Sequence, residues 1–467
     1  MKVYKAFLLT NIWELTVGSH PQATTISDIP VLNSMLSTAD SQEEDPRLRR
    51  TSVVKLIVTD AVEAKLKALC SLSSKLWNEV NYVRRMQFFG NKGVNLKGTY
   101  KEFYEKYKKL IGSATAQQIL NKNNEAWSSF FDLLKAKKEG KLPSFVTKVS
   151  PPGYKKKGKT RELWVVLRND QYKIEENKIV LKGLGAIGRI EMEYTGLIHL
   201  KGKQGRLEIH YNDNSWYAHI SFEIEEKAVR GIWRKVPQKP KGDLKAGIDL
   251  GVNNLFAVYV ENGVSALVNG RPLKSESHYW RERIAKYQSN INKYGVKTSR
   301  KLNAMYNKWR KRAKSFIDTQ VRRIVEWIYE IGVSTIYVGY PKNIAQQKGN
   351  FNISNVWSYD YVIKRLSEVS EEYGIKVQPV NEAYTSSTCP IHGSKCGNRI
   401  VRGLFKCTML NKVFNADIVG AFNILRKSIT PSPSRIGVTG RKPNPGLNEK
   451  DVALNLSALM GVRTLAL

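Results

Sequence analysis

The first half of the chain opens on a short strand-like run, Ser52 to Val58, that leads into a helical hydrophobic pattern. Downstream, apolar residues recur every three or four positions, namely Val62, Leu66, Leu69, Leu72, Leu76, Val80 and Val83. This spacing predicts an amphipathic helix with Asp60 as its N-cap and Glu63 at the N3 position. Helical spacing returns between Tyr100 and Leu134.

Between Leu163 and Ile224 the pattern changes to alternation. Trp216, Ala218, Ile220, Phe222 and Ile224 would share one face of a strand. Several short alternating runs separated by Gly-rich turns predict a small barrel. Because a strand also precedes the helical block, we expect that block to be an insertion into the barrel.

The second half of the chain alternates between strand and helix patterns, which predicts an α/β fold. A strand ends near Asp249, two long basic helices occupy residues 279 to 331, and a further strand covers Thr335 to Gly339. A helix, a strand reaching Glu382 and a helix opened by Asp417 follow. Acidic residues at the ends of these elements predict a carboxylate cluster at one edge of the sheet.

The charge of the chain points to a polyanionic partner. Lys and Arg number 76 against 41 Asp and Glu, a net charge of +35, whereas solubility alone requires only about 2 to 8 charges in a small domain. No apolar run approaches the ~20 residues of a membrane span, and no basic amphipathic helix dominates, so an anionic membrane surface is the weaker alternative. In the basic segments YKEFYEKYKKL and PPGYKKKGK the lysines could meet phosphates. Equally, Phe103 and Tyr107 could be core residues of a helix whose lysines face water.

Cysteine usage indicates a metal site and a reducing, cytoplasmic location rather than a disulfide framework. Three of the four cysteines cluster with a histidine, as Cys389, His392, Cys396 and Cys407. Four N and S ligands at this spacing match a closed tetrahedral Zn²⁺ site. The alternative is a ribbon held without metal by packing alone.

The order of motifs in the second half resembles one family. GIDLGVNNL resembles the first RuvC motif, and CPIHG, RGLFKC and NADIVGAFNIL resemble the zinc ribbon and third RuvC motif of the TnpB (OrfB) family, relatives of the type V CRISPR nucleases. The resemblance covers about residues 50 to 430. It implies an RNase H-like (RuvC) nuclease domain, a wedge-like β-barrel with an inserted helical recognition lobe, a guide RNA encoded near the transposon end, and a DNA target.

Pattern and resemblance together give the expected organisation of the chain. Residues 1–48 are an acidic, poorly ordered leader or a consequence of start-codon choice, and residues 429–467 are a disordered tail. The remaining segments are the barrel (49–60 and 160–230), the helical recognition domain (61–159), a linker (231–243), and the nuclease domain (244–428) with its zinc ribbon (386–412).

The chain departs from the family at one catalytic position. Most members carry a Glu at the end of the strand that corresponds to Thr335 to Gly339, whereas this chain has Gly339. One interpretation is a nuclease that no longer cleaves. The other is that Glu382 substitutes, since it ends the next strand, whose backbone would lie roughly 4.8 Å away. Fanzor proteins and some TnpB relatives are similar in having a glutamate relocated in this way.

Three carboxylates suit phosphodiester hydrolysis, because two divalent ions about 3.5 to 4 Å apart stabilise the attacking and leaving oxygens. Mg²⁺ prefers such ligands. We expect Asp249 to bridge two Mg²⁺ ions, with Glu382 and Asp417 each holding one. Three functions remain open at this stage: a guided nuclease, a guided binder that does not cleave, and an RNA-binding partner of a separate transposase.

Overall fold

The structure, a computed structural model, describes residues 48–142, 148–157, 160–340, 359–382, 385–401 and 403–429. The chain divides into two compact units that meet in sequence at Val236 and Pro237, and each is described by itself. Almost all of the expected leader and tail lies outside the described residues, so their expected disorder stays a prediction.

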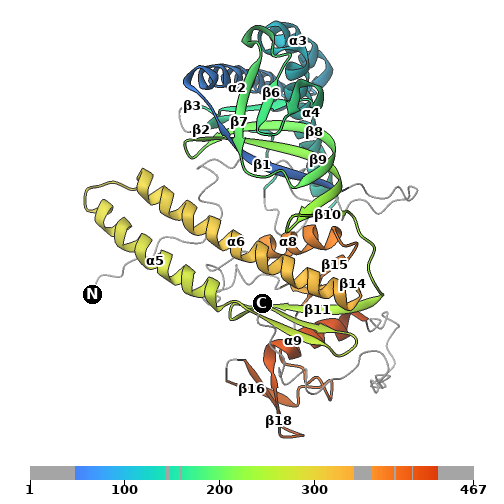
Figure 1. The fold of residues 1–467 in the computed structure, drawn as a ribbon. Coiled ribbons are helices and arrows are strands. Elements are labelled where there is room, and N and C mark those ends of the chain that lie inside the picture. Colours follow the sequence, from blue (N-terminus) through green and yellow to red (C-terminus); the bar gives the residue numbers. More distant parts are fainter. Residues whose placement is uncertain are drawn as a thin grey trace. The chain divides into compact units, whose positions relative to one another are not determined.

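The first unit is built on an eight-stranded antiparallel sheet with the order β4-β8-β9-β1-β7-β6-β5, and β10 pairs with β9 (Figure 1). Its strands are β1 (Arg49–Ile57), β4 (Trp164–Leu167), β5 (Tyr172–Ile174), β6 (Lys178–Leu181), β7 (Ile190–Thr195), β8 (Leu200–Asn212), β9 (Ser215–Val229) and β10 (Ile232–Lys235). Among the described residues β4 and β5 do not pair with each other, so the expected barrel is nearly but not fully closed. The short helix η2 (Asn169–Gln171) joins these two edge strands.

Three helices follow β1 in the chain, α2 (Asp60–Phe89), α3 (Leu96–Ile111) and α4 (Ser113–Lys138). A two-stranded ribbon of β2 (Lys156–Lys157) and β3 (Thr160–Arg161) and the short helix η3 (Gly185–Ile187) complete the unit. The helical pattern expected to continue from Tyr100 to Leu134 is broken at Gly112, which adopts a φ of 88° between α3 and α4. Only glycine reaches that backbone conformation without strain.

The expected N-cap of α2 was wrong by one residue. Thr59 is the N-cap, with extended backbone, and its side chain accepts a hydrogen bond from the Val62 N–H at 3.5 Å. The carboxylate of Glu63 contacts Lys67 and accepts a hydrogen bond from the Trp216 indole N–H. A tertiary contact therefore holds the side chain that the capping-box pattern would have directed to the helix end.

The packing of α3 decides between the two interpretations of its aromatic residues. Phe103 and Tyr107 are 5% and 1% exposed and belong to the hydrophobic core of the first unit. Their rings are therefore not available to nucleic acid. Tyr100 and Tyr104 are half-buried and stack on each other.

Part of the segment expected to be a linker, 231–243, forms strand β10. Val229 and Ile232 are paired, so only Arg230 and Gly231 make the turn, with φ values of 53° and 82°. Two consecutive positive φ values define the tight hairpin turn that matches strand twist. The turn was hard to predict from the sequence because Arg230 occupies the first turn position, where Asn or Asp is usual.

The second unit has a five-stranded mixed sheet with the order β13-β12-β11-β14-β15. Its strands are β11 (Leu244–Leu250), β12 (Asn254–Val260), β13 (Ser265–Asn269), β14 (Val333–Tyr340) and β15 (Lys376–Asn381). β11, β14 and β15 are parallel, whereas β12 and β13 are antiparallel to their neighbours. The expected α/β pattern is confirmed.

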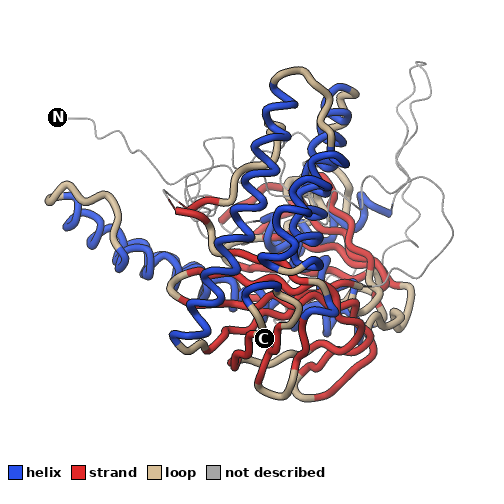
Figure 2. The backbone as a smooth tube through the Cα atoms, turned by 90° about the horizontal axis from the view of Figure 1, so that it is seen from above, coloured by secondary structure: helices blue, strands red, loops and turns tan. Residues whose placement is uncertain are grey.

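Helices cover the sheet through two separate hydrophobic clusters. One cluster joins the sheet to α6 (Arg300–Ile331) and α8 (Tyr359–Glu371), and the other joins it to α9 (Ala416–Ile429) and the Cys/His ribbon. The ribbon is a three-stranded sheet of β16 (Gly397–Val401), β17 (Leu404–Cys407) and β18 (Lys412–Asn415). Helix α5 (Arg271–Asn292) runs beside α6, and the pair projects from the sheet of its own unit in both views (Figures 1 and 2).

Candidate functional site

The expected carboxylates come from three elements of the second unit. Asp249 is the penultimate residue of β11, Glu382 directly follows β15, and Asp417 lies in the first turn of α9. Strand β14 lies between β11 and β15 and runs parallel to both, with Ile248 opposite Val338 and Gly339 opposite Val380. The carboxyl ends of the two outer strands thus flank Gly339 at one edge of the sheet.

The side chain of Glu382 reaches back over Gly339. A Cβ atom added to Gly339 would lie 2.9 Å from Glu382 Oε2 and 2.7 Å from the Cδ1 atom of Ile424. Real Cβ atoms essentially never approach other atoms so closely. The space above the strand end where a side chain at 339 would begin is therefore occupied by the Glu382 carboxylate.

A second glycine makes room for Asp249. A Cβ atom on Gly420 of α9 would lie 2.6 Å from Asp249 Oδ2 and 3.1 Å from its Cγ. Helix α9 also approaches β11 closely at Gly247, where a Cβ would lie 2.2 Å from the carbonyl oxygen of Ala421. The Asp249 carboxylate therefore rests directly against the backbone of the helix that carries Asp417.

Asp417 is held by two asparagines. Asn254, at the start of β12, donates its amide N–H to Asp417 Oδ2 at 2.8 Å. Asn415 precedes α9, and its Oδ1 accepts hydrogen bonds from the backbone N–H groups of Asp417 and Ile418 at 3.0 and 3.1 Å. The positive end of the helix favours a negative charge in this first turn.

The electrostatics of the site show that Asp249 senses the charges of both other acids. Burial raises the pKa of Asp249 well above its usual value, and the charges of Glu382 and Asp417 raise it further. Arg399 and the Leu250 N–H act in the opposite direction without cancelling the rise. Burial also raises the pKa of Glu382. A partly desolvated group of acids that repel one another is an environment that favours a bound cation.

The residue Tyr359 opens α8 near the same acids. Its pKa is raised by burial and then by the charges of Glu382 and Asp249. Its phenol therefore stays protonated at neutral pH.

The donor set of the acids fits oxygen-preferring divalent ions, but it does not form a closed cage. Among the described residues, only the Cys/His group brings three or more potential ligands together closely enough to hold one ion. The carboxylates are thus neighbours whose ligand atoms do not meet at a single point. An open arrangement leaves coordination positions for water and phosphate oxygens, which Mg²⁺ retains in enzyme sites.

The four metal ligands expected in the ribbon lie close together. The ligand atoms of Cys389, His392, Cys396 and Cys407 all lie within 4.8 Å of one another. His392 Nδ1 is 3.5, 3.1 and 3.5 Å from the three sulfurs in that order, and the sulfurs of Cys396 and Cys407 are 3.9 Å apart. Metal–ligand bonds of about 2.0 to 2.3 Å in a tetrahedron give separations of this size. The cluster could hold a structural zinc ion.

Backbone amides act on the two outer cysteines in the direction that favours the thiolate form. Burial raises the pKa of Cys389 to about 11, opposed by hydrogen bonds from the N–H groups of His392 and Ile391. At Cys407 burial acts in the same upward direction, but hydrogen bonds from the Leu410 N–H, the Cys389 thiol and the Met409 N–H together outweigh it, and the pKa is lowered. Donors aimed at both sulfurs favour the thiolate form that a metal requires.

Three residues that position the site were not singled out from the sequence. Gly420 and Asn254 contact the acids directly, and Asn423 of α9 donates to the carbonyl oxygens of Thr385 and Thr388 at 2.7 and 2.8 Å. The last contact fixes the segment that follows Glu382. All three lie within motifs that were recognised, GIDLGVNNL and NADIVGAFNIL, so the signal was present although the roles were not.

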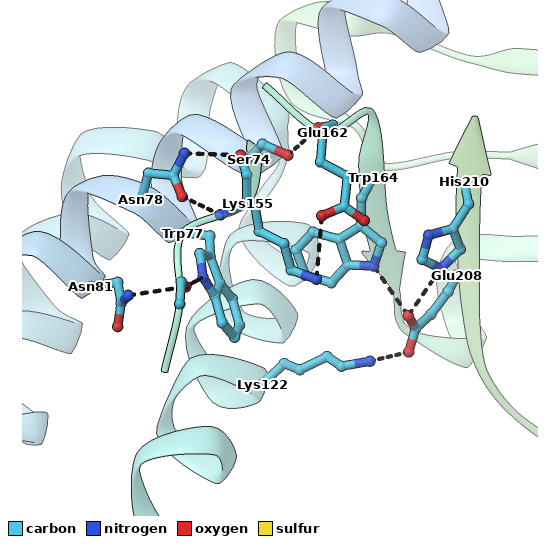
Figure 3. Close-up of polar contacts among 11 residues, drawn as sticks. Ser74, Trp77, Asn78, Asn81, Lys122, Lys155, Glu162, Trp164, Glu208 and His210 are labelled. Atoms are coloured by element: carbon cyan, nitrogen blue, oxygen red, sulfur yellow. Dashed lines mark hydrogen bonds and ion pairs between the residues drawn. The ribbon is translucent and has the colours of Figure 1, made fainter. Parts of the chain in front are cut away.

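In the first unit, helix α2 holds the basic loop PPGYKKKGK by its backbone (Figure 3). Asn81 donates to the carbonyl oxygens of Pro152 and Gly153 at 2.9 and 3.1 Å, and the Trp77 indole donates to Gly153 at 3.0 Å. Asn78 both donates to and accepts from the backbone of Lys155. This part of the loop is anchored, although its composition predicted only an irregular crossover.

The side chain of Lys155 lies against two tryptophans. Its Nζ atom is 4.6 Å from the ring centroid of Trp164 and 5.5 Å from that of Trp77. The Trp164 indole N–H donates to Glu208, which also pairs with Lys122 (Figure 3). One lysine of the basic loop is therefore part of the fold rather than of a free phosphate-binding surface.

Two family models match the chain. The model OrfB_IS605, described as "Probable transposase", matches residues 219–345, and the model "Cas12f1-like, TNB domain" matches residues 359–424. A curated relative, "TnpB-like protein ORF457" of Acidianus two-tailed virus, is 41% identical over 404 residues, which cover 82% of this chain and 87% of the relative. The chain belongs to the TnpB family, whose members are related to the type V effectors.

More distant relatives agree with this placement. "CRISPR-associated endodeoxyribonuclease Cas12f1" of Sulfoacidibacillus thermotolerans is 29% identical over 229 residues, covering 45% of this chain and 50% of that protein. The solved structure "Cryo-EM structure of the Cas12f1-sgRNA-target DNA complex" matches with a TM-score of 0.51 at 14% identity, covering 78% of this chain and 82% of that one. The latter likeness shows a shared fold. Within the described residues, no helix has the length and apolarity needed to cross a membrane.

Proposed function

We propose that this protein is an RNA-guided DNA endonuclease whose RuvC-like site uses a relocated glutamate. The observation that carries the proposal is the position of the Glu382 carboxylate, 2.9 Å from where a side chain at Gly339 would begin. Family membership supports a nuclease. The raised pKa of Asp249, to which burial and then the charges of Glu382 and Asp417 contribute, supports a cation site at the same edge.

Each side chain has a role that follows from its surroundings. Asp249 is the acid whose pKa is raised by burial and by the charges of both other acids, so it is assigned as the shared ligand. Glu382 and Asp417 would each be a ligand of one of the two ions, and Asn254 would restrain the Asp417 side chain through its hydrogen bond. Two divalent ions bound there would supply an activated water and stabilise the leaving oxygen.

Residues 244–429 correspond in this proposal to the expected nuclease domain, with the Cys/His ribbon as its zinc-binding insertion. Residues 49–236 correspond to the expected barrel with its inserted helical recognition lobe. The guide RNA would deliver sequence specificity by base pairing, as in RNA-guided systems generally. The strongly basic composition supports a protein that holds RNA and DNA together.

The test is cleavage of a plasmid that matches the guide RNA, with and without Mg²⁺. We expect Glu382→Gln to reduce cleavage by roughly a hundredfold or more while RNA and target binding persist, since the effect falls on the transition state. Glu371→Gln, a substitution of an α8 glutamate outside the acid group, is the matched control. Full cleavage by Glu382→Gln would refute the relocated site.

Because Gly339 carries no carboxylate, a second function is also considered: a guided DNA-binding protein that does not cleave. That protein would bind its matched plasmid equally well with and without Mg²⁺ and leave it intact. An RNA-binding partner of a separate transposase would neither cleave nor bind the matched DNA. Cleavage and binding of the matched plasmid, measured together, separate all three functions.

A further inference from the structure

The outer part of the α5–α6 hairpin is a small structural unit in its own right. Trp280, Ile284, Leu302 and Trp309 form a buried cluster that is separate from the core beneath the sheet. A hairpin tip with its own core keeps a fixed surface even though it projects from the rest of its unit (Figures 1 and 2). Its surface can therefore be preorganised for a ligand.

An open pocket of about 510 Å³ lies on this hairpin. This volume falls in the range of pockets that bind small ligands, roughly 300 to 1,000 Å³. Aromatic and basic side chains line it together: Tyr279, Trp280, Arg283, Lys286, Tyr287, Asn290, Lys301, Ala304, Met305, Lys308 and Arg312. No carboxylate lines it.

The cations of the pocket are only partly neutralised. Lys286 pairs with Glu282 and Arg312 with Glu276. Within the described part of the chain, Arg283, Lys301 and Lys308 form no ion pair and instead lie over the rings of Tyr279, Tyr287 and Trp280 at 5.8, 5.1 and 5.9 Å. Residues 279 to 314 contain twelve Lys and Arg and a single Glu. A bound polyanion would neutralise the repulsion among these positive charges.

Two of the rings are accessible. Tyr279 is 51% exposed and Tyr287 is half-buried, whereas Trp280 belongs to the hairpin core. Cations beside accessible rings are what a single-stranded nucleic acid requires, because phosphates meet the cations and unpaired bases stack on the rings. A duplex would offer no free base faces to Tyr279.

We propose that this pocket holds an unpaired stretch of the guide RNA, which deepens and rests on the function proposed above. The RNA is favoured over the DNA because the charge of the hairpin is permanent. A guide RNA stays bound between targets and would neutralise the repulsion throughout, whereas a DNA strand would do so only during cleavage. The occupied pocket would then fix the hairpin to the RNA.

The experiment uses the full chain and the RNA that copurifies with it, identified by sequencing, transcribed and labelled. Tyr279→Ala should weaken its binding by roughly 5- to 150-fold, the range for one stacked base, while Tyr279→Phe, which keeps the ring and loses only the hydroxyl that accepts a hydrogen bond from Arg283, should lose far less affinity. Lys301→Gln with Lys308→Gln should reduce the slope of log affinity against log salt by about 1.4. Far-ultraviolet circular dichroism checks that each variant is folded.

The matched control is Lys293→Gln with Lys297→Gln, which removes the same charge from the hairpin tip outside the pocket. Equal losses in both double variants, or unchanged RNA binding in Tyr279→Ala, would overturn the proposal. A loss confined to a labelled single-stranded oligodeoxythymidine would overturn the RNA assignment in favour of DNA.

Failure of this inference is distinguishable from failure of the proposed function. Plasmid cleavage by the unaltered chain tests the function without reference to the pocket. If cleavage occurs but Tyr279→Ala binds RNA normally, only the pocket assignment falls. If the unaltered chain does not cleave, RNA binding by the hairpin variants is still measured independently.

Discussion

Glu382 Oε2 and the α-carbon of Gly339 are arranged so that a side chain at residue 339 and the observed carboxylate exclude each other. The neighbouring strands β14 and β15 pair in parallel, which brings Glu382 to the same strand end by a different route along the chain. The absence of a side chain at residue 339 and the position of the Glu382 carboxylate therefore depend on each other, and one substitution can test both.

Gly339→Ala should reduce cleavage at least tenfold while lowering the free energy of unfolding by no more than about 1 to 3 kcal/mol. The added methyl group would push only the ends of two flexible side chains, Glu382 and Ile424, so the fold accommodates it but the carboxylate moves. Gly93→Ala is the control, since no atom lies within 4 Å of the added methyl there. Normal cleavage by Gly339→Ala would show that the Glu382 position is not required.

The ribbon should contain about one zinc ion per chain by elemental analysis. Cys389→Ser combined with Cys407→Ser should abolish zinc binding and lower the thermal unfolding midpoint of the second unit, because the ribbon core includes both cysteines. Cys70→Ser is the control, since Cys70 is buried in the first unit, far in sequence from the cluster. Unchanged zinc content in the double variant would contradict the ligand assignment.

Two adjacent lysines of the basic loop should behave differently. Lys155→Gln should destabilise the first unit by about 0.5 to 2 kcal/mol, because it removes a cation that contacts Trp77 and Trp164 and pairs with Glu162. Lys156→Gln, on an exposed side chain, should leave unfolding unchanged and lower RNA affinity more at low salt than at high salt. Chemical denaturation and RNA binding measured on both variants check this; equal stability losses would contradict it.

Acidification should destabilise the first unit through His219. Burial, and then the charge of His210, lowers the pKa of His219 to about 4, from 6.5 in an unfolded chain. The folded state therefore binds fewer protons than the unfolded state between these pH values. The contribution of His219 to the free energy of unfolding is complete above pH 6.5 and is lost as the pH falls towards 4. Allowing for solvent screening, we expect a loss of about 1 kcal/mol between pH 7 and pH 5.

His219→Gln should remove most of that pH dependence, as measured by chemical denaturation at pH 5, 6 and 7. The pKa of Glu208 is lowered as well: burial raises it, but hydrogen bonds from His210 and Lys122 and the Lys122 charge prevail. The stability that Glu208 contributes to the first unit is lost only below the ordinary carboxylate pKa near 4.5, so Glu208 does not affect the measurements between pH 5 and pH 7. An unchanged slope in the variant would mean that another group titrates.

The elements of the second unit were largely predictable because each strand and helix carries its own periodic pattern. The acids at the strand ends were predictable too, since parallel strands place their carboxyl ends at one edge. By contrast, the contact between Asp249 and Gly420 joins positions 171 residues apart. No local pattern marks a glycine whose missing Cβ makes room for a distant carboxylate, and therefore the role of Gly420 emerged only from the packing of α9.

The first unit was harder to predict where the turn chemistry was unusual. The Arg230-Gly231 turn lacks the residues that normally announce a hairpin, so β10 was taken for linker. The N-cap of α2 was misplaced for a related reason, because Thr59 and Asp60 are both good capping residues and only the backbone angles decide between them.

The pairing of β1 with β9 also has a consequence for the order of folding during synthesis. Leu56 pairs with Trp216, which is 160 positions later in the chain. At roughly 5 to 20 residues per second, β1 therefore waits about 8 to 32 seconds for β9 to be made, and only slightly less for its other partner, β7. Helices α2, α3 and α4 need only local contacts and can form meanwhile, and residues of α2 share a core with Val54 and Leu56. The inserted helices thus shield the apolar face of an unpaired strand from aggregation until the sheet is completed.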